Sequence, residues 1–237
     1  MSRQRVWDLP TRLFHWSLVG AVITAVVTGK IGGNWIEWHG RSGLFILGLL
    51  IFRLIWGFVG SPTARFASFV RGPGAIKAYL KGEWRGIGHN PLGALAVLAL
   101  LGLAAAQVVS GLFANDDIAF AGPLAQLVSS ERSGQITGLH VWLFNGLLAV
   151  VGLHVAAITF YARVKRTNLV LPMVTGYQDL SDGMPPVSHP KTSFVLRLAA
   201  FIAASAIASA AVYAAAGGFI DEPAPAQTVG QQAAPAW

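Results

Sequence analysis

The amino-acid sequence predicts an all-α integral membrane protein, in which a bundle of four transmembrane helices is followed by a fifth transmembrane helix. Three observations predict this class. Hydrophobic residues make up 54% of the 237 residues and charged residues only 11%, whereas a soluble domain carries about 25% charged residues. Five apolar stretches are each long enough to cross a bilayer. Basic residues gather in alternate connections between these stretches, so the net charge of +7 indicates membrane topology and no nucleic-acid partner.

The five apolar stretches begin near the N-terminus and differ in composition. The first is short, with Phe14 and Trp16 at its aromatic end, and Pro10 and Thr11 stand where a helix is expected to begin. No small-residue cleavage site follows it, which favours a retained anchor over a signal peptide. The fifth is rich in alanine and could pack closely on the bundle or on a second copy of the chain, giving a homo-oligomer. The spans are expected at residues 13–29, 38–60, 93–114, 138–161 and 194–216.

Charge in the connections predicts the orientation of the spans. Basic residues gather in the N-terminal segment, in residues 61–92 and in residues 163–191. The positive-inside rule therefore places the N-terminus in the cytoplasm and the C-terminus on the opposite side of the membrane. We expect residues 61–92 to form a basic amphipathic segment on the inner surface. Acidic residues then face the periplasm: Glu37, Asp116, Asp117, Glu131, Asp221 and Glu222.

The chain divides into three parts by composition. Residues 1–178 hold the four-helix domain, residues 179–216 a cytoplasmic linker and the fifth helix, and residues 217–237 a disordered periplasmic tail rich in Pro, Ala and Gln. The sequence contains no cysteine. This absence excludes disulfides, cysteine-ligated iron–sulfur clusters and thioether-attached haem within the chain.

Four histidines near the ends of three spans form two pairs matched in depth. His140 and His154 are fourteen residues apart, so at ~100° per residue they leave the same face of one helix, about 21 Å apart along its axis. The first span runs outward and the second inward. His15 therefore lies at the inner depth of His154, and His39 at the outer depth of His140.

Two pairs of opposed imidazoles inside a bilayer indicate cofactor binding. Polar groups in hydrocarbon are costly, so histidines there are by default functional, although a single one could be a hydrogen-bonded core residue. Two imidazoles facing each other across a helical bundle suit haem iron with both axial positions filled. Zinc prefers three or four ligands, and no Asp or Glu lies within a span. We therefore expect two haem b groups, the inner held by His15 and His154 and the outer by His39 and His140.

Two arginines lie near the expected inner haem. Arg53 follows His39 by fourteen residues and shares its helical face at the inner end of the second span. Its guanidinium could pair with the haem propionates or extend to the membrane surface, and the sequence leaves both open. Arg12 has a similar position on the first span. Small residues could make room for flat macrocycles or serve helix packing: Gly43, Gly48, Gly146 and Gly152.

A set of motifs resembles a known family. The chain opens with VWDLPTRLFHW, closes its second span with FRLIWGFVGSPTARFASF, and continues with GHNPLGALAVLALL, GLHVAAITFY and NLVLPMVTG. Over roughly residues 4–178 these motifs resemble the prokaryotic cytochrome b561 family, in particular members related to the cytochrome b subunits of nickel–iron hydrogenases. The resemblance implies a four-helix domain with two b-type haems ligated from helices one, two and four. On this chain the implied ligands are His15, His39, His140 and His154.

The expected function is electron transfer across the inner membrane by a dihaem cytochrome b. The resemblance implies exchange between the membrane quinone pool and a partner, either a periplasmic c-type cytochrome or a hydrogenase-like complex with an iron–sulfur subunit. No residue is assigned a catalytic role, because iron with both axial sites filled binds no substrate. Alternatives are superoxide oxidation linked to quinone at the outer haem, for which the basic candidates are Lys30, Arg41 and Arg132, a histidine-based metal transporter, and a passive anchor subunit.

Overall fold

The structure is a computed structural model that describes residues 2–84, 86–118, 120–180 and 193–218. Five long helices dominate it: α1 (Leu9–Ile31), α2 (Ile36–Val59), α5 (Pro91–Phe113), α6 (Ser130–Arg163) and α8 (Phe194–Ala215). Each is long and apolar enough to cross a membrane. Within the described ranges, the predicted all-α membrane class and the five predicted spans are confirmed.

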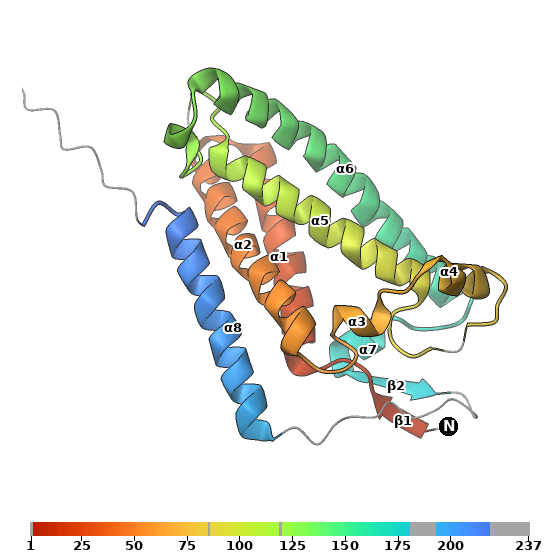
Figure 1. Cartoon of the computed structure of the whole chain (residues 1–237). Helices are drawn as coiled ribbons and strands as arrows, with labels where there is room; N and C mark the ends of the chain where they lie inside the picture. The colour runs from red at the N-terminus through yellow and green to blue at the C-terminus, as the bar shows by residue number, and fades with distance from the viewer. Residues whose placement is uncertain (1, 85, 119, 181–192, 219–237) are drawn as a thin grey trace, which may run out of the picture.

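The helices form two antiparallel hairpins and a fifth helix beside them. In Figure 1, α1 and α2 form one hairpin, α5 and α6 form the second, and α8 lies along α2 on the side away from α5 and α6. We call the end of the bundle that carries the N-terminus the inner end, and the end that carries the connection between α5 and α6 the outer end. The 3₁₀ turn η1 (Gly33–Trp35) joins α1 to α2 at the outer end.

Side chains at the helix starts explain where three of the spans begin. The carboxylate of Asp8 accepts a hydrogen bond from the Thr11 amide at 2.8 Å, and Pro10 occupies the first turn of α1. Asn90 caps α5 in the same way through the amide of Gly93 at 2.7 Å. Ser129 caps α6 through the amide of Arg132 at 3.3 Å. The start predicted for α1 from Pro10 and Thr11 is confirmed.

Helix α6 is longer than the apolar pattern indicates, because its first two turns are polar. It has 34 residues and begins eight residues before the predicted span. Ser133 donates a hydrogen bond to the Phe113 carbonyl at 2.8 Å, and Thr137 accepts one from the Asn115 amide at 3.0 Å. These bonds tie the polar turns of α6 to the end of α5 at the outer end.

The inner end carries small elements that the sequence analysis missed. Strand β1 (Ser2–Arg5) pairs antiparallel with β2 (Tyr177–Leu180), and helix α7 (Val170–Thr175) precedes β2. Figure 1 shows them gathered below α1 and α2. The strands are too short for a two-residue period to stand out, so their pairing depends on the fold around them.

Residues 61–92 do not form the single amphipathic segment that was expected. They contain two short helices, α3 (Phe66–Phe69) and α4 (Pro73–Leu80). A 3₁₀ turn outside this segment, η2 (Ala125–Leu127), lies at the opposite end of the bundle. Helix α3 ends at Phe69, and Gly72 and Pro73 begin α4 as its N-cap and first residue. Phe69 is buried, so α3 belongs to the packing of the inner end and not to a membrane-surface helix.

Helix α8 packs on the bundle through its small residues. Ala204 and Ala208 are buried against Phe52 and Trp56 of α2. A Cβ added to Gly48 of α2 would lie 3.1 Å from the Val212 side chain of α8. The alanine-rich face therefore contacts this chain's own bundle, and a homo-oligomer stays a prediction.

Part of the predicted organisation lies outside the described residues. This applies to most of the linker, to Lys191, to Asp221 and Glu222, and to the tail after residue 218. The division into residues 1–178, 179–216 and 217–237 stays a prediction, and so does the orientation of the termini.

Candidate functional site

The structure brings the predicted outer pair of histidines together. His39 is in the first turn of α2 and His140 is in α6, and both side chains are half-buried. Their ring centres are 6.0 Å apart and the ring planes are close to perpendicular, at 81°. Two side chains 101 positions apart in the sequence thus face each other at the outer end, as their matched depths predict.

His39 is held against α1 by its second ring nitrogen. Its Nδ1 lies 2.8 Å from the Ala25 carbonyl oxygen. A carbonyl only accepts, so Nδ1 carries the proton and Nε2 keeps its lone pair. A Cβ added to Gly29 would lie 2.7 Å from Nδ1. Glycine at this position lets the ring approach the backbone of α1 closely enough for the bond.

His140 lies against α5, where two polar side chains meet its ring. The Gln107 amide nitrogen is 2.9 Å from Nε2, and the Ser110 hydroxyl is 3.0 Å from Nδ1. A Cβ added to Gly111 would lie 3.1 Å from the ring. None of these three residues was predicted from the sequence. Their signal was present, since Gln107 and Ser110 are two polar residues three positions apart in an otherwise apolar span.

The inner pair lies at the inner end of the bundle. His15 is in the second turn of α1 and His154 is in the inner half of α6. His15 Nδ1 is buried and has no hydrogen-bond partner among the described residues. Trp16 contacts the His15 ring edge to face, with ring centres 5.0 Å apart.

Arg53 and Arg12 are both turned into the inner end. Only 3% of Arg53 is exposed, and its Nη2 donates to the Ala64 carbonyl at 3.0 Å. Its guanidinium lies 4.8 Å from the centre of the Phe66 ring. Arg12 donates through Nη1 to the Val174 carbonyl at 2.6 Å. Arg53 is therefore buried, and the alternative in which it extends to the membrane surface is wrong.

His89 belongs to the same buried cluster. Its ring lies between those of Trp7 and Phe69, with centres 4.7 and 4.5 Å away. Burial, and secondly the positive charge of Arg53, lower the pKa of His89 to about 4. His89 is therefore neutral near pH 7.

The inner end concentrates buried polar atoms that lack a partner among the described residues. Buried polar groups are normally paired, so such a group calls for an explanation. A bound group bearing carboxylates would accept hydrogen bonds from the arginines and hydroxyls here. The haem propionates fit this donor set. The atoms are Thr11 Oγ1, Arg12 Nε, His15 Nδ1, Arg53 Nη1, Ser61 Oγ and His89 Nδ1.

The donor sets also separate haem from other metal centres. In the described parts of the chain, no group of three or more His, Asp or Glu side chains gathers. Pairs of imidazoles suit an iron whose four equatorial ligands come from a porphyrin, and they do not complete a tetrahedral zinc site. A Cβ added to Gly43, Gly146 or Gly152 would meet nothing within 4 Å, so these glycines are not required by close packing against a neighbouring side chain.

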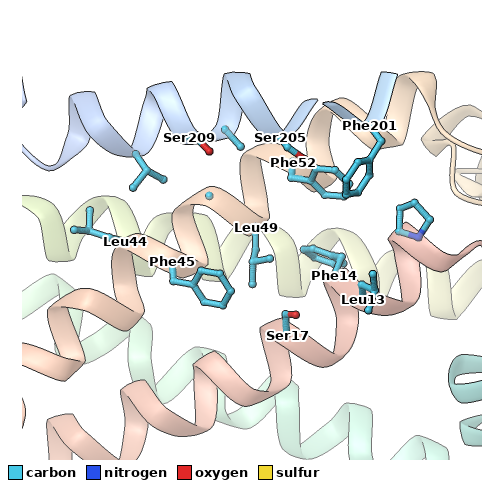
Figure 2. A pocket seen from close by; sticks show the side chains of 14 residues that line it. Leu13, Phe14, Ser17, Leu44, Phe45, Leu49, Phe52, Phe201, Ser205 and Ser209 are labelled. Carbon is cyan, nitrogen blue, oxygen red and sulfur yellow. The ribbon is translucent and has the colours of Figure 1, made fainter. Parts of the chain in front are cut away.

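A separate groove lies between α1, α2 and α8. It encloses about 430 Å³ and is apolar apart from Ser17, Ser205 and Ser209. Figure 2 shows these serines with Phe14, Phe52 and Phe201 around it. None of the paired histidines lines this groove, so it is distinct from both candidate haem sites.

Comparisons with known proteins match the four-helix core. The family model described as prokaryotic cytochrome b561 matches residues 6–176. Two similar proteins, from Azotobacter chroococcum mcd 1 and Azotobacter vinelandii, are each named "Probable Ni/Fe-hydrogenase B-type cytochrome subunit". Each is 27% identical over 222 residues, covering 76% of this chain and 90% of the relative. No solved structure matches the chain. The chain belongs to the prokaryotic cytochrome b561 family.

Proposed function

We propose that this membrane haem b electron-transfer protein carries electrons across the bilayer through two bis-histidine haems. His15 and His154 would hold the inner haem, and His39 and His140 the outer one. The observation that carries the proposal is the opposed outer pair, with ring centres 6.0 Å apart. Two metal–imidazole bonds of about 2 Å each, plus the distance from each nitrogen to its ring centre, require about 6 Å.

The state of the ligands supports the same proposal. The Nδ1 proton of His39 is bonded to the Ala25 carbonyl, which leaves Nε2 available for iron. A second-sphere acceptor of this kind fixes the ring orientation and increases the basicity of the ligand. With both axial positions filled, haem iron changes oxidation state without binding substrate, so the bound groups supply electron conduction.

The residues of the inner end would compensate the charge of the propionates. Arg53 and Arg12 each have a buried nitrogen with no partner among the described residues. Carboxylates in a low-dielectric site need charged donors of this type. His89 is neutral near pH 7, so it adds a hydrogen-bonding ring without adding charge.

The partners follow from the family and from the two depths. The relatives are named as subunits of nickel–iron hydrogenases, and a hydrogenase-like iron–sulfur subunit is one candidate partner for this chain. A periplasmic c-type cytochrome is the other. The membrane quinone pool would exchange electrons with the second haem. Two haems at different depths divide a ~30 Å crossing into shorter steps.

A liposome assay tests transmembrane electron transfer directly. Protein is inserted into liposomes that hold ferricyanide, and a membrane-impermeant reductant is added outside. We expect the internal ferricyanide to be reduced with the parent protein, and the rate to fall to that of empty liposomes with His39→Ala or His154→Ala. Ser205→Ala, in the separate groove, is the matched control and should retain the parental rate. A colourless protein that retains a divalent metal and reduces no ferricyanide would contradict the proposal and favour a metal-transport role.

A further inference from the structure

Two polar side chains of α5 contact the two nitrogens of the His140 ring. Ser110 Oγ is 3.0 Å from Nδ1, and Gln107 Nε2 is 2.9 Å from Nε2. Ser110 is buried, with 5% of its surface exposed. Two hydrogen bonds to side chains of α5, one at each ring nitrogen, therefore hold the His140 ring between α5 and α6.

The hydrogen-bond donors determine which ring nitrogen carries the proton. A serine hydroxyl has one proton, and that of Ser110 is donated to the Gln107 backbone carbonyl at 2.9 Å. Ser110 Oγ must therefore accept from the Nδ1–H of His140. The Gln107 amide nitrogen can only donate, so Nε2 of His140 holds the lone pair. Both contacts give the same tautomer, with the proton on Nδ1 and the lone pair on Nε2.

We propose that Ser110 is a positioning residue that orients His140 and tunes the outer haem. This inference rests on the proposed function, because it concerns the bond from Nε2 to iron. Accepting a hydrogen bond from Nδ1–H makes the imidazole more basic, and a more basic ligand would stabilise ferric over ferrous iron. Ser110 therefore lowers the potential of the outer haem. The Gln107 amide, which contacts the same Nε2 lone pair, would have to move away for this nitrogen to hold iron.

Ser110 is the side chain through which this effect can be tested. The corresponding acceptor for His39 is the Ala25 backbone carbonyl, which a substitution at residue 25 does not remove. If Ser110 only donated a hydrogen bond to the Gln107 carbonyl, its replacement would leave the potential of the outer haem unchanged. The potential therefore separates a positioning role from a structural one.

The experiment is a spectroscopic redox titration of full-length protein carrying Ser110→Ala, Ser110→Thr or the control Ser17→Ala. The outer haem is identified as the component missing from His39→Ala. We expect Ser110→Ala to keep two haems and to shift the outer potential upward, with the inner potential unchanged. Ser110→Thr keeps the hydroxyl, and Ser17→Ala lies in the separate groove, so both should titrate as the parent does.

Each outcome decides the inference. An unchanged outer potential in Ser110→Ala would overturn it. If Ser110→Ala loses the outer haem, parental haem content and potential in Ser110→Thr support the role of the hydroxyl, and loss in both variants overturns it. Gln107→Leu should keep the outer haem, because the amide contact with Nε2 is not made when Nε2 holds iron; loss of this haem would overturn the inference by showing that Gln107 supports the haem site. If the proposed function is wrong, the parent protein itself shows no two-component haem titration. This result distinguishes failure of the proposed function from failure of the inference about Ser110.

Discussion

The four paired histidines differ in what surrounds their second ring nitrogen. His39 bonds to a backbone carbonyl and His140 to a serine hydroxyl. His15 Nδ1 has no partner among the described residues and lies at the end that holds Arg12 and Arg53. The proposed ligands therefore have different environments at the two depths, and we expect these environments to set how each haem iron would behave.

Replacing one ligand should remove one haem only. In His154→Ala the inner iron loses an axial ligand, whereas His39 and His140 at the outer end are untouched. We expect the haem content to fall by half and the remaining haem to stay reducible. The measurement is the haem-to-protein ratio with a redox titration. Loss of both haems would indicate global unfolding or a different pairing.

His89 makes stability depend on pH. Its pKa is about 4 in the folded protein, against 6.5 for an unperturbed histidine. Below pH 6.5 the unfolded chain binds a proton that the folded chain does not bind until about pH 4, so stability is lost as the pH falls through this window. At about pH 5 the loss is about 2 kcal/mol.

Thermal unfolding at neutral pH and at about pH 5 measures this loss. His89→Gln cannot take up the proton, so its unfolding temperature should fall less than that of the parent between the two conditions. An equal fall in both proteins would show that the pKa of His89 is not lowered. His89→Gln should keep both haems, because His89 is not among the proposed ligands.

At the residue scale, helical periodicity predicted which histidines form pairs, but it did not predict the residues that hydrogen-bond to these histidines. The positions of His15, His39, His140 and His154 suffice to match their depths. Ser110 was not predicted, because a hydroxyl in a span can equally bond to the preceding turn of its own helix, as Thr24 does. The Ala25 carbonyl has no sequence signal at all.

At the scale of elements, hydropathy located the five spans but did not predict the polar segments of the fold. The polar start of α6 and the pairing of β1 with β2 depend on contacts between distant segments, such as that of Ser133 with Phe113. Residues 61–92 show the same limit. Their mixture of apolar and basic residues fits an amphipathic surface helix, but Gly72 and Pro73 interrupt this segment and Phe69 is buried.

Helix α8 should be dispensable for haem binding. It contributes none of the paired histidines, and it lies beyond the residues matched by the family model. Deleting residues 193–237 should leave two haems and an unchanged b-type spectrum, with a lower unfolding temperature because the α2 surface covered by Ala204 and Ala208 is lost. Haem quantification and thermal unfolding check this. Loss of either haem would show that α8 supports a haem site.

At the scale of the whole molecule, charge is distributed unequally between the two sites. The proposed inner site lies beside buried Arg53 and half-buried Arg12, and positive charge there would stabilise reduced iron, which carries one positive charge less. The proposed outer site has hydrogen-bond acceptors on both of its histidines, which would stabilise oxidised iron. In the proposed dihaem arrangement, both effects would make the inner haem the better electron acceptor.

The outer haem should therefore titrate at a lower potential than the inner one. Electrons would then pass downhill from the outer to the inner end. The potentials are measured in the parent, and each is assigned with His15→Ala, which retains the outer haem, and His39→Ala, which retains the inner haem. An outer potential above the inner one would contradict this distribution of charge.

The most direct test of the account is the number of b-type haems bound by each chain of purified full-length protein. The count is obtained from haem released into pyridine, divided by protein measured through amino-acid analysis. We predict two haems for each chain, with one lost in every single variant of the four histidines. One haem for each parent chain, or a protein without haem after expression with ample haem supply, would contradict the proposal that opposed imidazoles hold iron porphyrin at two depths.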